Sequence, residues 1–304
     1  MKNDFLSISD LSIKELKKVF ELTKSIKKQP RKYKNYLNGK VLACIFEKQS
    51  LRTRVTFEVG IKQLGGESIY LAPADISLGK RESVYDVAKN LERWVDGIMI
   101  RTFGHNIVVE MADAAKIPII NGLTDLEHPC QAIADFFTVL EHKKKFKKLK
   151  FTYVGDGNNV CHSLMLTAAK LGIEFYAATP KGYEPSKDIF EKALEDAEKT
   201  GAIINIVNDP IEAVTKTDVV YTDVWASMGQ ESEAAKRKKI FKDYQVNSKL
   251  MSYAKKDAIF MHCLPAHRGE EVTDEVLDSE QSVVYDEAEN RLHAQKAIMC
   301  LLMK

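Results

Sequence analysis

The stretch "SLRTR", which begins at Ser50, places two hydroxyls and two guanidinium groups in five residues, shortly after the apolar run "VLACIF" that ends at Phe46. Apolar residues then recur at helical spacing until two glycines, so the stretch begins a predicted helix with Ser50 as its N-cap. The first turn of a helix favours anions and disfavours cations. Arg52 and Arg54 therefore indicate that an external anion completes the site. Alternatively, Ser50 only caps the helix, and the arginines reach solvent or pair with Glu47 or Glu58.

Three further groups of polar residues in the first half of the chain could donate hydrogen bonds to an anionic or carbonyl ligand. They are Ser77, Lys80 and Arg81 in "DISLGKRESV", Arg101 at the end of the predicted strand "GIMIRT", and His128 and Gln131 in "HPCQAIADFF". The end of a strand in an α/β sheet is where ligands commonly bind. Each group also has a structural interpretation, as a polar loop, a structural arginine or a turn histidine.

The second half contains a strand, a glycine turn and a helix in "YVGDGNNVCHSLMLTAAKLG", which superficially resembles a dinucleotide-binding unit. The segment lacks GxGxxG, and no acidic residue closes the next strand, so a nucleotide cofactor is not indicated. Two later segments, "TDVWASMGQESE" and "FMHCLPAHRG", follow predicted strands and are rich in polar groups. Asp223 could nevertheless be a helix cap, Met228 a core residue and Cys263 a buried packing residue.

Short β-rich runs alternate with longer helical patterns, which is typical of parallel sheets covered by helices. We expect an α/β fold of two doubly wound parallel-sheet domains, with the C-terminal helix packing back on the first domain. The lysine run "KKKFKKLK" marks the boundary, so the domains are residues 1–142 with 288–304, and residues 148–287. The predicted strands are residues 40–46, 97–102, 117–122, 150–156, 173–179, 202–207, 218–225, 258–264 and 282–287.

Composition excludes several classes of protein. Among 304 residues, 45 Lys and Arg balance 43 Asp and Glu, so the chain lacks the polybasic character of a nucleic-acid or membrane-surface binder. The charged amino terminus does not read as a signal peptide, and no segment is long and apolar enough to span a bilayer. The five cysteines never form a CxxC pair, so we expect neither a disulfide framework nor a zinc site, and a reducing cytoplasm fits best.

"SLRTR", a lone arginine after a strand, and "HPCQ", in this order and together with "FMHCLPAHRGEEV", closely resemble the aspartate and ornithine carbamoyltransferases. The resemblance covers essentially the entire chain. It implies catalytic roles for Arg101, His128 and Cys263, and no metal or organic cofactor. The residues that it assigns to carbamoyl phosphate are Ser50, Leu51 through its backbone N–H, Arg52, Thr53, Ser77, Arg101, His128, Gln131, Cys263, Leu264 and Arg291.

The same resemblance implies that the second domain binds L-ornithine. The residues concerned are Asn159, Asp223, Ser227 and Met228. In the aspartate enzymes this segment reads His-Pro-Leu-Pro, whereas this chain has "HCLP", which resembles the ornithine enzymes. The implied reaction gives L-citrulline and phosphate from carbamoyl phosphate and L-ornithine. Cys263 would lie near the attacking δ-amine, and the carbonyl of Leu264 would accept a hydrogen bond from it.

Two residues depart from the family pattern. Leu51 replaces a threonine and keeps only the backbone N–H, and Ser77 replaces a glutamine that reaches a neighbouring subunit, so Lys80 or Arg81 could take over that contact. The family forms homotrimers or multiples of trimers, and residues 229–245 read as a mobile loop that closes over ornithine. Three alternatives stay open: a carbamoyltransferase for putrescine or an acylated ornithine, a nucleotide-dependent oxidoreductase, and an inactive paralogue.

Overall fold

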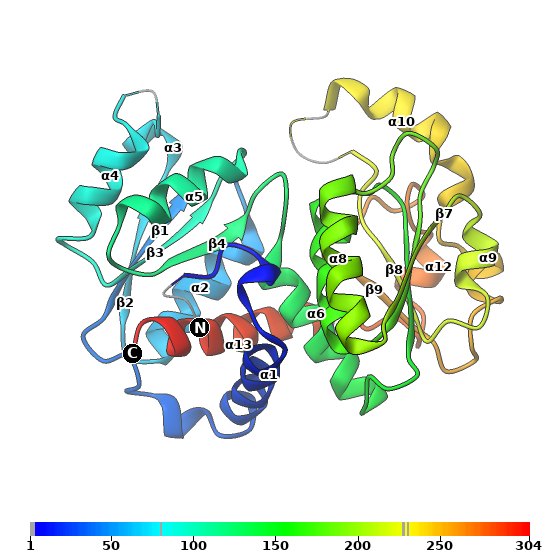
Figure 1. Ribbon diagram of the computed structural model, residues 1–304, viewed down its shortest axis with the longest axis horizontal. Helices are drawn as coiled ribbons and strands as arrows, with labels where there is room; N and C mark the ends of the chain where they lie inside the picture. Colours follow the sequence, from blue (N-terminus) through cyan, green and yellow to red (C-terminus); the bar gives the residue numbers. More distant parts are fainter. Residues whose placement is uncertain (1–3, 80, 227–228, 230) are drawn as a thin grey trace. The chain divides into compact units, whose positions relative to one another are not determined.

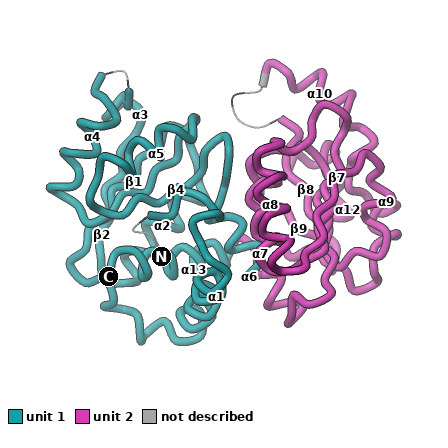
Figure 2. The backbone as a smooth tube through the Cα atoms, viewed as in Figure 1, with its two compact units in different colours: residues 1–137, 289–304 teal, residues 138–288 magenta. Residues whose placement is uncertain are grey.

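The computed structural model describes residues 4–79, 81–226, 229 and 231–304, and it has an α/β fold (Figure 1). The chain divides into two compact units (Figure 2). The first consists of residues 1–137 and 289–304, and the second of residues 138–288. Each unit contains a parallel sheet, as the alternation of strands and helices predicts.

The first unit is built on four parallel strands in the order β2-β1-β3-β4. They are β1 (Val41–Phe46), β2 (Glu67–Leu71), β3 (Gly97–Arg101) and β4 (Ile119–Leu123). Helices α4 (Val84–Leu91) and α5 (His105–Ala114) bury one face of this sheet in an apolar cluster with β1, β3 and β4. The remaining elements are η1 (Ile8–Asp10), α1 (Ile13–Lys28), η2 (Pro30–Tyr33), α2 (Leu51–Gln63) and α3 (Pro73–Ile76).

The last helix, α13 (Val284–Leu302), packs on this unit because two glycines leave room for Met299 and for Met303 just beyond the helix. A Cβ atom at Gly60 of α2 would lie 3.0 Å from the Cε atom of Met299, and one at Gly97 of β3 would lie 3.2 Å from Met303. Figure 1 shows α13 with α1 and α2, away from α4 and α5. Helices therefore cover both faces of the sheet.

The second unit has five parallel strands in the order β7-β6-β5-β8-β9. They are β5 (Lys150–Val154), β6 (Glu174–Ala178), β7 (Ile203–Val207), β8 (Val219–Thr222) and β9 (Ile259–His262). One face is buried in an apolar cluster with α9 (Pro210–Val214), α11 (Ser248–Met251) and α12 (Asp274–Leu277), and Figure 1 shows α8 on the other face. The other elements are α7 (Asn159–Leu171), α8 (Lys187–Thr200), η3 (Glu231–Glu233), α10 (Ala234–Ile240) and η4 (Lys242–Tyr244). Helix α6 (Pro129–Lys143) begins in the first unit and ends in the second.

Three features of the secondary structure differ from the prediction. Residues 282–287 are not a strand, because only Ser282 bridges to Phe260 and α13 begins at Val284, with two acidic residues in its first turn. Strand β2 was not predicted, since "ESIYL" is a short, partly exposed edge strand. The segment 229–245 contains η3, α10 and η4 where a loop was expected.

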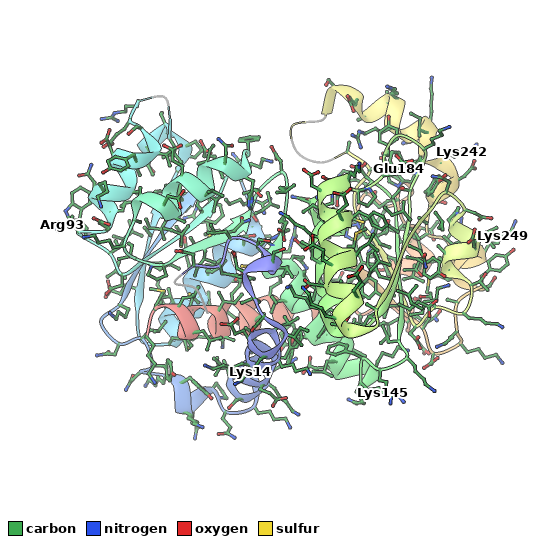
Figure 3. All side chains as sticks on the ribbon, viewed as in Figure 1. Lys14, Arg93, Lys145, Glu184, Lys242 and Lys249 are labelled. Atoms are coloured by element: carbon green, nitrogen blue, oxygen red, sulfur yellow. The ribbon has the colours of Figure 1, made fainter. Side chains whose placement is uncertain are left out.

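The lysine run after α6 is solvated, as predicted. The helix ends at Lys143, β5 begins at Lys150, and Figure 3 shows Lys145 projecting from the surface. Among the described helices, none combines the length and the apolarity that crossing a membrane requires.

The strand order determines where each unit can bind a ligand. In the first sheet the connections diverge between β1 and β3, and in the second they diverge between β5 and β8. Open parallel sheets bind ligands at the carboxyl ends of the strands on either side of such a point. The helix start after β1 and Arg101 at the end of β3 share the first position. The glycine turn after β5 and Asp223 after β8 share the second.

A buried ion pair fastens α10 to the second sheet. The NH1 atom of Arg237 lies 2.9 Å from Oδ2 of Asp156 and donates to the carbonyl oxygen of Trp225 at 2.9 Å. Nε of Arg237 donates to Glu233 at 3.0 Å, and the guanidinium lies over the ring of Tyr183. Burial raises the pKa of Asp156 from 3.8 to about 6, even though Arg237 opposes the shift.

The folded state therefore binds a proton at Asp156 more tightly than the unfolded state does. Its contribution to stability falls as the pH rises from about 4 to about 6. We predict that Arg237→Leu lowers the free energy of unfolding by about 3–5 kcal/mol at pH 8, because a buried carboxylate loses its partner. At pH 5 Asp156 is protonated in the variant, so the loss shrinks by at least about 1 kcal/mol.

Urea denaturation at fixed protein concentration, at pH 5 and pH 8, measures this effect. The matched control is Lys238→Leu on the same helix, whose exposed pair with Glu270 spans 3.0 Å and contributes at most about 1 kcal/mol. An Arg237→Leu loss that is equal at both pH values would contradict the electrostatic explanation.

Candidate active site

The start of α2 has the N-cap that the sequence predicts. The Oγ atom of Ser50 accepts a hydrogen bond from the N–H of Thr53 at 3.2 Å. Arg54 takes the structural role, because its Nε atom donates to Glu58 at 3.0 Å and its guanidinium lies 3.6 Å from the ring centroid of Tyr70. The side chain of Leu51 is 73% exposed, so only its backbone belongs to the helix start.

Two arginines from distant elements meet at the hydroxyl of Thr53. NH2 of Arg291, on α13, donates to Oγ1 of Thr53 at 3.0 Å, and NH1 of Arg101, at the end of β3, approaches the same oxygen at 3.5 Å. All three side chains are buried. Because the hydroxyl oxygen faces two donors, the proton of Thr53 is directed elsewhere and can be donated to a ligand. This cluster is suited to an oxygen-rich anion.

His128 is buried beside this positive charge. Burial holds the pKa of His128 well below its usual range, and the positive charges of Arg291, Arg101 and Arg52 lower it further. The imidazole is therefore neutral at physiological pH. A neutral imidazole can donate one hydrogen bond to a carbonyl oxygen without adding a fourth charge.

Gln131, near the start of α6, belongs to the same cluster. Its Oε1 atom accepts a hydrogen bond from NH1 of Arg291, and its Nε2 atom donates to Oδ1 of Asp135 at 2.7 Å. Asp135 is completely buried and was not predicted as a site residue. The sequence could have indicated its contact with Gln131, because residues four apart on a helix lie on the same face.

In the second unit, Asp223 follows β8 and is held between two neighbours. Its Oδ2 atom accepts from Nδ2 of Asn158 at 2.8 Å, and its Oδ1 atom accepts from the thiol of Cys263 at 3.1 Å. Asn158 is the N-cap of α7, and its Oδ1 atom accepts from two backbone N–H groups. Asn158, which was not predicted as a site residue, thereby orients the carboxylate. Asn159 is the first residue of α7 and is partly exposed.

The turn after β9 positions Cys263 and Leu264. Leu264 has a left-handed backbone with φ of 58°, and its N–H donates to Nδ1 of His262 at 2.8 Å. Nε2 of His262 lies 3.1 Å from Oε1 of Glu271, and the N–H of His262 donates to Glu287 at 3.0 Å. A left-handed conformation costs a leucine about 1–2 kcal/mol, and these hydrogen bonds offset that strain.

One group of potential metal ligands lies here. Side-chain ligand atoms of Asp223, His262 and Cys263 lie within 4.8 Å of one another. Both ring nitrogens of His262 already have partners in Leu264 and Glu271, so coordination would break a hydrogen bond of the turn. The described residues therefore favour a turn-forming role for this histidine.

Other predicted residues lie elsewhere or outside the described parts of the chain. Ser77 ends α3 in a left-handed conformation, and its hydroxyl donates to the carbonyl of Pro73 at 3.4 Å. Lys80, Ser227 and Met228 fall outside the described residues.

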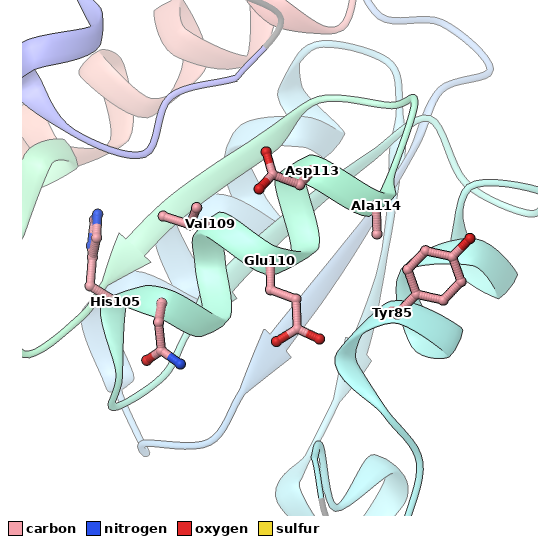
Figure 4. A pocket seen from close by; sticks show the side chains of 7 residues that line it. Tyr85, His105, Val109, Glu110, Asp113 and Ala114 are labelled. Atoms are coloured by element: carbon pink, nitrogen blue, oxygen red, sulfur yellow. The ribbon is translucent and has the colours of Figure 1, made fainter.

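A surface pocket on α4 and α5 shares no residue with the predicted site (Figure 4). It is lined by Tyr85, His105, Asn106, Val109, Glu110, Asp113 and Ala114.

Two family models together match nearly the whole chain. Residues 3–141 match the family model "Aspartate/ornithine carbamoyltransferase, carbamoyl-P binding domain", and residues 147–302 match "Aspartate/ornithine carbamoyltransferase, Asp/Orn binding domain". The ornithine carbamoyltransferase of Carboxydothermus hydrogenoformans is 55% identical, with 99% of this chain and 97% of that protein covered.

Two further relatives are similar over nearly their whole length. The catabolic ornithine carbamoyltransferase of Thermoplasma acidophilum is 51% identical over 99% of both chains. The solved ornithine carbamoyltransferase of Pyrococcus furiosus superimposes with a TM-score of 0.96 at 50% identity, covering 99% of this chain and 96% of that one. The chain therefore belongs to the aspartate and ornithine carbamoyltransferase family of transferases.

Proposed function

We propose that this protein transfers the carbamoyl group of carbamoyl phosphate to the δ-amine of L-ornithine, giving L-citrulline and phosphate. One observation supports ornithine as the acceptor. The thiol of Cys263, in the "HCLP" turn, donates to the carboxylate of Asp223 at 3.1 Å. Full-length relatives with 50–55% identity bear the name ornithine carbamoyltransferase, which supports the same choice.

The first unit is the proposed site of carbamoyl phosphate. Ser50, the N–H of Leu51, Arg52 and Thr53 cradle the phosphate at the helix start, where backbone donors and the dipole favour an anion. Arg101 bridges the phosphate and the carbonyl oxygen. The remaining proposed contacts to carbamoyl phosphate come from Ser77, His128, Gln131, Cys263, Leu264 and Arg291.

Catalysis follows from the charge that develops as the amine attacks. Negative charge grows on the carbonyl oxygen of carbamoyl phosphate, and Arg101 and neutral His128 donate to it without reorganising. One such donor is typically worth about 3 kcal/mol of barrier. A C–N bond forms, the C–O bond to phosphate breaks, and the departing phosphate takes the proton of the amine. The transfer balances without a metal, an oxidant or an organic cofactor.

The second unit is the proposed site of ornithine. Asn159 and Asp223 hold the amino-acid end, together with Ser227 and Met228. A carboxylate at Asp223 suits the α-ammonium group and would repel the second carboxylate of aspartate. Cys263 and the carbonyl of Leu264 face the δ-amine, which must be neutral in order to attack.

We infer the order of binding, the domains, the assembly and the location of the protein from its resemblance to the family. Carbamoyl phosphate binds first, and the segment 229–245 closes over ornithine. The functional domains are residues 1–142 with 288–304, and residues 148–287. The protein forms a homotrimer or a multiple of trimers, acts in the cytoplasm and has no nucleic-acid or membrane partner. Relatives named anabolic and catabolic are 50% and 51% identical to this chain.

We predict that Arg101→Ala lowers kcat/KM for carbamoyl phosphate by about 10²–10³-fold or more, because a donor to the developing oxyanion is lost. Steady-state citrulline formation measures the loss, and circular dichroism checks the fold. Arg93→Ala removes the same side chain at an exposed position (Figure 3) and should leave kcat/KM unchanged. Activity within a few-fold of the unmodified protein would remove Arg101 from the mechanism.

A comparison of amine acceptors tests the proposed function itself. With carbamoyl phosphate present, ornithine should yield citrulline and phosphate in equal amounts, while aspartate and putrescine should yield no carbamoylated product above background. Carbamoylation of another amine in place of ornithine would overturn the acceptor assignment. An increase in melting temperature with NAD(P), but not with carbamoyl phosphate, would favour an oxidoreductase.

A further inference from the structure

Asp135 on α6 makes a buried contact that the proposed mechanism does not yet use. Its side chain is 0% exposed, and its Oδ1 atom lies 2.7 Å from Nε2 of Gln131, one helical turn earlier. On the other side, the carboxamide oxygen of Gln131 accepts from NH1 of Arg291. The carboxamide is therefore held between an anion and a cation.

These two neighbours define which end of the carboxamide donates and which end accepts. A carboxylate can only accept hydrogen bonds, so the amide nitrogen must face Asp135. A guanidinium can only donate, so the amide oxygen must face Arg291. Reversing the amide would set oxygen against oxygen and nitrogen against nitrogen. Glutamine alone has no such preference between its two ends.

The fixed orientation matches the polarity of a carbamoyl group. The carboxamide oxygen lies on the side of Arg291, whose other nitrogen contacts the hydroxyl of Thr53 at 3.0 Å. That hydroxyl receives donors from both Arg291 and Arg101, so it can only donate further. A ligand at this place meets a donor for an oxygen and an acceptor for an N–H group. Carbamoyl phosphate presents both, whereas acetyl phosphate carries a methyl group in place of the amide.

We propose that Asp135 is a positioning residue that fixes the carboxamide of Gln131 and so selects a carbamoyl phosphate over an acyl phosphate. This inference rests on the proposed function of the first unit. Asp135 acts through Gln131 and does not touch the substrate. Loss of its acceptor would let the carboxamide rotate and present its donor end to the substrate amide.

The test exchanges the two functional groups while preserving shape and net charge. Gln131→Glu sets two carboxylates against each other and should lower kcat/KM for carbamoyl phosphate by about 100-fold or more. Asp135→Asn alone should cost less than about tenfold, because the asparagine oxygen can still accept. In the double variant the introduced asparagine donates to the introduced glutamate, whose far oxygen again faces Arg291, so activity should recover at least about tenfold over Gln131→Glu.

Discrimination between ligands supplies a readout that a purely structural role would not change. The ratio of the inhibition constant of acetyl phosphate to the KM of carbamoyl phosphate should fall at least about tenfold in Asp135→Leu, which removes the acceptor so that the carboxamide of Gln131 can rotate. The ratio should stay within about threefold in Asp135→Asn, whose side-chain oxygen can still accept. Val139→Ala, also buried on α6, is the control for destabilisation. It should lower the melting temperature and leave the ratio unchanged.

A double variant no better than Gln131→Glu, or a ratio in Asp135→Leu equal to that of the unmodified protein, would overturn the role of Asp135. Calorimetric affinities for carbamoyl phosphate and acetyl phosphate, measured without an amine, separate this outcome from failure of the proposed function. A protein that discriminates between the two ligands through Asp135 but carbamoylates no ornithine would contradict only the proposed function.

Discussion

In the first unit, two buried guanidinium groups converge on the hydroxyl of Thr53. Charged groups lose several kcal/mol of hydration on burial, and Arg101 and Arg291 approach one hydroxyl. A bound anion would offset this cost. The same charges, together with burial, keep His128 neutral. Attraction for an anion and the neutrality of His128 therefore follow from one arrangement.

This arrangement explains why the chain returns to its first unit. Arg101 is delivered by the end of β3 and Thr53 by the first turn of α2, both at the point where the strand order diverges. Arg291 lies on α13, 160 residues beyond the glutamine of α6 that it contacts. Gly60 and Gly97 allow the end of the chain to pack closely on α2 and the sheet. The close packing of α13 therefore holds the guanidinium of Arg291 beside Thr53.

Much of this could be predicted from the sequence, and the failures have physical causes. The buried strands were evident because parallel strands covered on both faces are continuously apolar. Strand β2 lacks that signal since it lies at an edge of the sheet. The segment "SVVY" was predicted as a strand from its β-forming residues, but Asp286 and Glu287 favour the helix start that the structure has there. The capping role of Ser50 and the pairing of Arg54 with Glu58 were both foreseen. The orienting residues Asp135 and Asn158 were not, because their roles depend on the partners that the fold supplies.

The proposed reaction joins the carbamoyl carbon to the δ-nitrogen of ornithine. The most direct measurement supplies [¹³C]carbamoyl phosphate with [δ-¹⁵N]ornithine and follows the ¹³C NMR spectrum. The proposed transfer predicts that the carbamoyl signal becomes a doublet through a new ¹³C–¹⁵N bond, with one phosphate released for each bond formed. Phosphate release without that coupling, or carbon attached to the unlabelled α-nitrogen, would contradict it.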